Sequence, residues 1–126
     1  MPNYKQINLE QMKKIVDSQA PVVIIDARTP KWDDGRRIPS ALSMPADMPV
    51  ELFAQFLPNK DKPLIIYCGG GNCPAARILC ERLIAAGYSD VTEYAGGIKE
   101  WSDEKKYPVE LAIKSSQNDC GSNCEL

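Results

Sequence analysis

The chain contains no histidine among its 126 residues. This absence excludes the cysteine–histidine and serine–histidine arrangements of nucleophilic catalysis and every histidine-ligated metal site. No apolar run approaches the roughly 20 residues needed to cross a bilayer. The net charge of −2 predicts neither a nucleic acid nor an anionic membrane as partner. Because the first residues lack the pattern of a secretory signal, we expect a cytoplasmic protein.

The chain is rich in cysteine for a domain of its size. An odd number of cysteines argues against a complete disulfide framework. In a reducing compartment cysteines more often serve catalysis, redox chemistry or metal binding than structural crosslinking. The five candidates are Cys68, Cys73, Cys80, Cys120 and Cys124.

Helical and extended patterns alternate along the chain. Apolar spacing predicts helices over 9–18, 50–57 and 75–86, the last capped by Gly87, and a short helix from Gly96 to Trp101. Short apolar runs predict strands over 22–26, 41–44, 64–67 and 91–94. This alternation predicts an α/β fold, a small parallel sheet with helices on both faces. We expect the domain to occupy 1–110 and residues 111–126 to form a polar, flexible tail.

Cys68 occupies the most informative position in the chain. It ends the 64–67 strand and opens the glycine-rich loop Cys68-Gly-Gly-Gly-Asn-Cys73 before the 75–86 helix. Ligands of parallel sheets bind beyond the carboxyl ends of the strands. Backbone N–H groups converge in such a loop, so we expect the pKa of Cys68 to lie below the value of about 8.5 for a free thiol. The alternative is a buried cysteine that packs as a small hydrophobic residue.

Four stretches, in this order, resemble the single-domain rhodanese family. They are Val22-Val-Ile-Ile-Asp-Ala-Arg28, Ile38-Pro-Ser-Ala41, Ile65-Ile-Tyr-Cys68, and Gly87-Tyr-Ser-Asp-Val91 followed by Gly96-Gly97 and Trp101. The resemblance covers about residues 7 to 108. It implies a rhodanese-like sulfurtransferase in which Cys68 takes a sulfane sulfur from a donor, holds it as a persulfide and passes it to a thiophilic acceptor.

The resemblance also implies the residues that bind the donor. The backbone of the loop would hold it, through Gly69, Gly70, Gly71 and Asn72. The family often has an arginine where Cys73 stands here, so this loop has no charge of its own. Arg28, Arg36 and Arg37, from neighbouring loops, are the candidates for binding an anionic donor. Thiosulfate, polysulfide, a small persulfide and a persulfide on a partner protein all stay open. No cofactor or metal is implied, and the oligomeric state is open.

The other cysteines allow several roles. Cys73 is either a resolving thiol, which would attack a Cys68 persulfide, release sulfide and leave a disulfide, or a small residue that fills the helix start. Cys80 lies on the apolar stripe of its helix and is expected in the core. Cys120 and Cys124 either reduce or unload the site, or take no part. Their long spacers disfavour a four-thiolate zinc site with Cys68 and Cys73.

Two functions besides sulfur transfer stay open. One is a thiol–disulfide or polysulfide reductase in which Cys68 and Cys73 cycle between dithiol and disulfide. The other is a non-catalytic binding module. Around the site, we expect Asp26 and Arg28 to pair structurally and the charged residues of 99–106 to form a solvated face.

Overall fold

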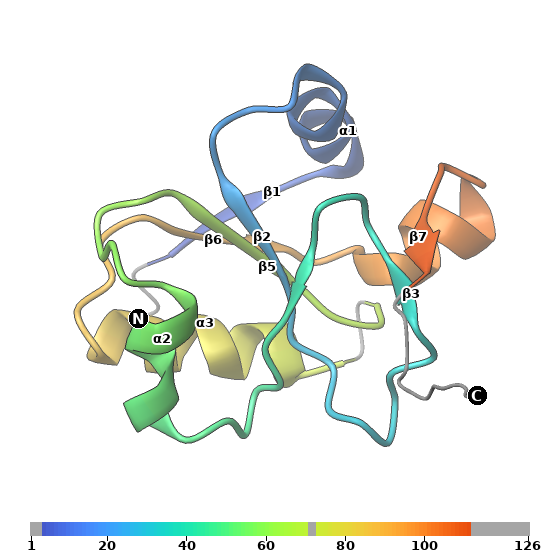
Figure 1. Ribbon diagram of the computed structural model, residues 1–126. Helices are drawn as coiled ribbons and strands as arrows, with labels where there is room; N and C mark the ends of the chain where they lie inside the picture. The colour runs from blue at the N-terminus through green and yellow to red at the C-terminus, as the bar shows by residue number, and fades with distance from the viewer. Residues whose placement is uncertain (1–3, 71–72, 112–126) are drawn as a thin grey trace, which may run out of the picture.

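The computed structural model describes residues 4–70 and 73–111. Its centre is a five-stranded sheet in the order β1-β6-β5-β2-β4, in which every paired strand is parallel (Figure 1). The strands are β1 (Lys5–Ile7), β2 (Val23–Asp26), β4 (Leu42–Ser43), β5 (Leu64–Tyr67) and β6 (Val91–Tyr94). A separate antiparallel pair joins β3 (Arg36–Arg37) to β7 (Glu110–Leu111). The expected α/β fold is confirmed.

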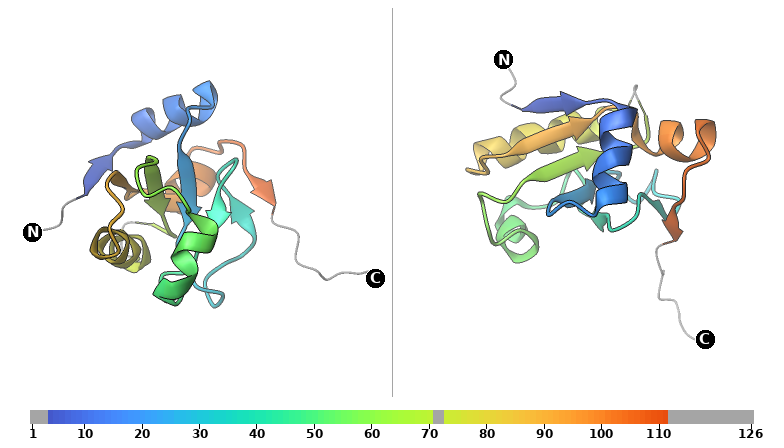
Figure 2. Two further views of the ribbon diagram at one scale, coloured as in Figure 1. Left: turned by 60° about the vertical axis from the view of Figure 1, so that its left-hand side comes forward. Right: turned by 90° about the horizontal axis from the view of Figure 1, so that it is seen from above.

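Helices cover both faces of the sheet. α1 (Leu9–Ser18) lies on one face, and α2 (Phe53–Phe56) and α3 (Ala75–Ala85) lie on the other (Figure 2). Two further short turns of helix are η1 (Val50–Leu52) and η2 (Lys99–Glu104). A capping box starts α1, because the side chains of Asn8 and Gln11 each accept a hydrogen bond from the other's backbone N–H.

Alternate residues of β5 point into two separate apolar clusters. Leu64 and Ile66 pack with buried side chains of α3 on one face. Ile65 and Tyr67 pack on the other face with α1 and with the fully buried Trp101 of η2. A strand buried on both faces needs a continuous apolar sequence, which is why the 64–67 run carries no polar alternation. Cys68 follows directly after β5, the central strand of the sheet, and is itself buried in the first of these clusters.

The boundaries differ from expectation in a few places. The 50–57 helix is split between η1 and α2. The helix expected from Gly96 to Trp101 begins at Gly97 and continues through η2 to Glu104. Ala86 is the C-cap of α3, and Gly87 follows it with φ at +100°. The expected tail falls almost wholly outside the described residues, and Leu111, its first residue, belongs to β7. No helix in the described part of the chain is both long and apolar enough to cross a membrane.

Candidate active site

The loop that follows β5 is fixed by backbone hydrogen bonds from the turn after β6. The carbonyl oxygen of Cys68 accepts the N–H of Ile98, and that of Gly69 accepts the N–H of Lys99, both at 2.9 Å. The turn can approach so closely because residue 97 is glycine. Gly97 has φ at +66°, and a Cβ there would lie 2.5 Å from the carbonyl oxygen of Cys68. The β6–η2 turn and the Cys68 loop thus form one packed unit.

Two thiols lie in contact at the start of α3. Cys68 is only 3% exposed, whereas Cys73 is half-buried. The Cys68 thiol donates a hydrogen bond to the Cys73 carbonyl oxygen at 3.3 Å, and each of the two thiols shifts the pKa of the other. Both cysteines are free, as is the fully buried Cys80, which confirms the expected core position of Cys80.

The pKa of the Cys68 thiol is shifted in the direction opposite to the one expected. Burial raises the pKa of Cys68 to about 12, and the hydrogen bond with Cys73 adds to this, while the N–H groups of Ala76 and Gly70 offset only part. The expected fall in the pKa of Cys68 is therefore wrong, because the loop dipoles are outweighed by loss of water around the sulfur.

The more accessible sulfur is the more acidic one. Partial burial opposes ionisation of Cys73, but hydrogen bonds from the Cys68 thiol and from the N–H groups of Gly69 and Ala75 outweigh it. The positive charge of Arg28 acts in the same direction, so the pKa of Cys73 is lowered. The surroundings of Cys73 thus favour its thiolate, whereas the Cys68 thiol donates its proton to the carbonyl oxygen of Cys73.

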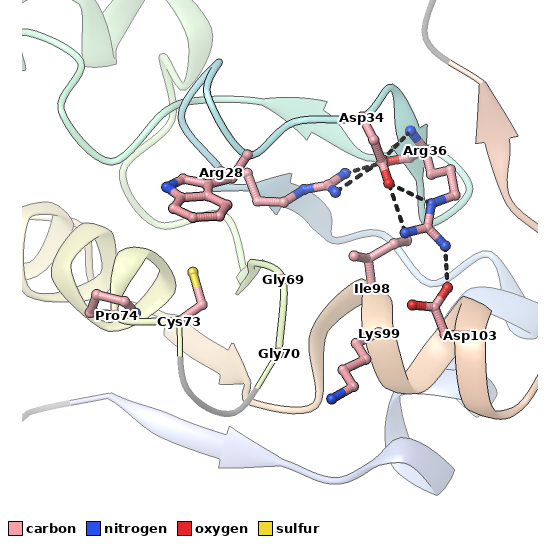
Figure 3. A pocket seen from close by; sticks show the side chains of 11 residues that line it. Arg28, Asp34, Arg36, Gly69, Gly70, Cys73, Pro74, Ile98, Lys99 and Asp103 are labelled. Carbon is pink, nitrogen blue, oxygen red and sulfur yellow. Dashed lines mark hydrogen bonds and ion pairs between the residues drawn. The ribbon is translucent and has the colours of Figure 1, made fainter.

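Two cavities meet at Cys73. The first, which we call the loop cavity, has a volume of about 500 Å³ and lies between the Cys68 loop, the β6–η2 turn and the segment from Arg28 to Arg36 (Figure 3). The second, the α3 cavity, has a volume of about 430 Å³ and lies against the first half of α3. Of the described residues, Cys73, Pro74 and Trp32 line both cavities, and Cys68 lines neither.

The loop cavity is walled by charged and loop residues. Besides the three that it shares, its lining residues are Arg28, Asp34, Arg36, Gly69, Gly70, Ile98, Lys99 and Asp103. The α3 cavity is more apolar, and its own lining residues are Thr29, Ala46, Asp47, Ala75, Ile78 and Arg82. Trp32 is 66% exposed, so it does not pack in the core, and it lines both cavities.

Arg28 reaches the loop cavity but its charge is already paired. Its guanidinium donates to the buried Asp26 at 2.9 Å and to Asp34 at 3.1 Å, which confirms the expected Asp26–Arg28 pair. Burial alone would lower the pKa of Arg28, but the bonds and charges of these carboxylates raise it. Figure 3 shows the guanidinium directed toward Asp34 and away from Cys73.

The structure does not bring Arg37 to the cavity with the other expected site residues. Its guanidinium donates twice to Asp33, at 2.7 Å each, and once to Asp26 at 3.4 Å. Arg36, the third arginine considered as a source of positive charge, lines the loop cavity and pairs with Asp34 and Asp103. All three arginines are thus held by carboxylates.

Lys99 is the cavity cation that sequence reasoning missed. Lys99 belongs to the 99–106 segment, which was expected to form a solvated face. Instead, the aliphatic part of its side chain packs along Gly70, and the residue lines the loop cavity (Figure 3). Within the described ranges its ammonium makes no ion pair or hydrogen bond. The available signal was its place two residues after the Gly96-Gly97 pair, at the same sheet edge as Cys68.

Of the remaining residues expected at the site, two line the loop cavity and the others lie outside the described residues. Gly69 and Gly70 line the loop cavity. Gly71 and Asn72 lie outside the described residues, as do Cys120 and Cys124 and the alternatives built on them.

The comparisons with known proteins agree with this fold. The rhodanese-like domain family matches residues 8–104. The chain is 24% identical over 105 residues to "Adenylyltransferase and sulfurtransferase UBA4" of Candida albicans, covering 79% of this chain but 24% of that protein. It is 29% identical over 97 residues to a protein of Allochromatium vinosum named "Sulfurtransferase", covering 77% and 87%. A solved structure from Bacillus halodurans superposes with a TM-score of 0.75 at 25% identity, covering 85% of this chain and 77% of that one.

These matches place the chain in a family, since one of them spans most of its length. The protein belongs to the rhodanese-like domain family. It spans about a quarter of the Candida albicans relative and most of the Allochromatium vinosum relative.

Proposed function

We propose that this protein is a sulfurtransferase that moves sulfane sulfur from a donor to a thiophilic acceptor and stores it as a persulfide on Cys68. The donor is thiosulfate, polysulfide or a persulfide, and the acceptor is a thiol on a small molecule or a partner protein. The proposal includes a cytoplasmic location, because free thiols persist in a reducing compartment.

The observation that carries the proposal is the environment of the two sulfurs. Cys68 and Cys73 lie at the first turn of α3, where N–H groups of Ala75 and Ala76 are directed at them. Such donors stabilise the anion of a persulfide without a metal or a cofactor. The names of the two sulfurtransferase relatives add support from outside the chain.

Lys99 supports an anionic donor in particular. Thiosulfate, polysulfide and persulfides all carry negative charge at neutral pH, and Lys99 is the cavity cation that no described carboxylate neutralises. In a site partly shielded from water, one such charge has a substantial effect on the binding of an anion.

Mass spectrometry of the intact, reduced protein tests the proposal. After exposure to each donor and removal of excess, the wild-type chain should gain one sulfur atom, assigned to Cys68 by fragment-ion spectra. The double variant Cys68→Ser/Cys73→Ser should gain none, whereas Cys80→Ala, which removes a buried thiol that faces neither cavity, should gain one as the wild type does. A wild-type chain that takes no sulfur from any of the three donors would show that the proposal is wrong.

A second candidate is a disulfide-cycling reductase, favoured by the hydrogen bond between the two thiols. In that cycle one thiol attacks the inner sulfur of the other's persulfide, expels hydrosulfide and leaves a Cys68–Cys73 disulfide, which an external thiol then reduces. Loss of two hydrogens in place of the gain of sulfur, abolished in Cys73→Ser, would favour the reductase over the sulfurtransferase.

A further inference from the structure

Access to the two thiols is unequal. Cys68 is only 3% exposed, and its thiol donates a hydrogen bond to the carbonyl oxygen of Cys73. Cys73 lies at the surface shared by the two cavities, beside Pro74 and Trp32. A donor molecule in either cavity thus reaches the sulfur of Cys73 before that of Cys68.

The charge distribution favours the same order. A nucleophilic sulfur must be a thiolate, and a thiolate is costly where water is excluded. Cys73 has partial solvent access, the nearby charge of Arg28 and a hydrogen bond from the Cys68 thiol. Cys68 has its proton directed at acceptors on residue 73 and little contact with water.

We propose that Cys73 is the thiol that attacks the sulfur donor, and that Cys68 receives the sulfur from it in a second step. This inference rests on the proposed sulfurtransferase function and reverses the order in which the two cysteines act. Cys73 is then a catalytic residue in its own right, neither a filler of the helix start nor a resolving thiol that acts last.

The first step is a displacement at the sulfane sulfur. The Cys73 thiolate attacks the outer sulfur of an organic persulfide, R–S–S⁻, a bond forms between the two sulfurs, and the S–S bond of the donor breaks. The products are the Cys73 persulfide anion and the thiolate R–S⁻, so charge and electrons balance. With thiosulfate the leaving group is sulfite, and the same balance holds.

The second step passes the sulfur inward. The Cys68 sulfur attacks the outer sulfur of the Cys73 persulfide, and the bond from that outer sulfur to Cys73 breaks. The proton of the Cys68 thiol moves to the departing Cys73 sulfur. The products are the Cys68 persulfide anion and the Cys73 thiol, with the same total charge as the reactants. The Cys68 S–H is already directed at residue 73, so its proton can pass to the Cys73 sulfur without a histidine.

Single variants separate the two orders of attack. Cys73→Ser should load sulfur at least about tenfold more slowly than the wild type, because the remaining thiol is buried and protonated. Cys68→Ser keeps a hydrogen-bond donor beside Cys73, and it should still take up one sulfur atom, which stays on Cys73 because the second step is blocked. If Cys68→Ser takes up no sulfur while Cys73→Ser loads normally, Cys68 attacks first and the proposal is overturned.

Alkylation of the wild-type chain tests the order without any sulfur donor. Under native conditions near neutral pH, iodoacetamide should label Cys73 first and Cys68 at least about tenfold more slowly, with fragment-ion spectra assigning the site. Cys68→Ala, which removes the hydrogen-bond donor, should slow labelling of Cys73, and Cys68→Ser should not. Labelling of Cys68 before Cys73 overturns the proposal, whether or not the protein transfers sulfur. Failure of all sulfur loading with Cys73 still labelled first would instead contradict the proposed function alone.

Discussion

Replacing Gly97 by alanine should disrupt the contact between the β6–η2 turn and the Cys68 loop. Gly97 has φ at +66°, a conformation that costs an L-residue about 1–2 kcal/mol. The added Cβ would also lie 2.5 Å from the carbonyl oxygen of Cys68, and 2.8 Å from both the carbonyl carbon of Gly69 and the nitrogen of Gly70. These are backbone atoms, so no side chain can rotate away and the loop itself must move.

Movement of the loop weakens two hydrogen bonds. They run from the N–H groups of Ile98 and Lys99 to the loop carbonyls, each at 2.9 Å. With about 0.5–1.5 kcal/mol for each bond and about 1–2 kcal/mol for the backbone, Gly97→Ala should lower the free energy of unfolding by about 2–5 kcal/mol. The displaced loop should also load sulfur more slowly.

Gly87→Ala is the matched control. Gly87 also has positive φ, at +100°, but a Cβ there would meet only the flexible side chain of Lys60, at 3.5 and 3.6 Å. This variant should therefore lose only the backbone contribution of about 1–2 kcal/mol. Urea unfolding measures both, with a slope of about 1–3 kcal/mol per molar urea. If Gly97→Ala is no less stable than Gly87→Ala, the argument from the close approach is refuted.

Three further predictions concern single side chains. Lys99→Met keeps the apolar stem but removes the charge, so loading from thiosulfate should slow by about tenfold, equivalent to about 1.4 kcal/mol, and added salt should narrow the difference from wild type. Partial burial opposes ionisation of Asp33, but the hydrogen bonds from Arg37 and Gly35 lower its pKa below 3.8. Its contribution to stability is therefore present above that pH and is lost as the pH falls through the lower pKa of the folded state. In Asp33→Asn, the urea concentration at the unfolding midpoint should therefore fall less steeply at acid pH than in the wild type. Tyr67→Phe removes the oxygen that accepts the N–H of Ile38 at 3.0 Å, and should cost about 1–3 kcal/mol in urea unfolding.

The sequence predicted the centre of the fold better than its margins. β5 and β6 were expected over the residues that they occupy, because apolar strands buried on both faces leave a continuous apolar run. β1, β3 and β7 were not expected, since each is two or three residues long and has no continuous apolar run to mark it. They depend on their partners, as β3 does on β7, and such pairing is a long-range property of the fold.

The candidate site was predicted in its residues more than in its electrostatics. Arg28 reaches the cavity as expected, but the sequence did not reveal that Asp34 would occupy its guanidinium. The pKa of Cys68 was expected to fall because the dipoles of a loop and a helix are visible in the sequence. The burial that reverses this depends on how α3 and η2 close over the loop, which only the folded chain shows. Lys99 was missed because a surface charge and a cavity charge look alike in a sequence.

The hydrogen bonds from Ile98 and Lys99 to the loop carbonyls have a consequence for spectroscopy. Their amide hydrogens exchange with solvent only when the turn and the loop separate, so their exchange rates measure how often the loop opens. A sulfur atom or a donor that tightens the loop should slow exchange at both amides, although their residues are far along the chain from either thiol. Sulfur has no convenient magnetic resonance signal of its own, and these two amides would supply one.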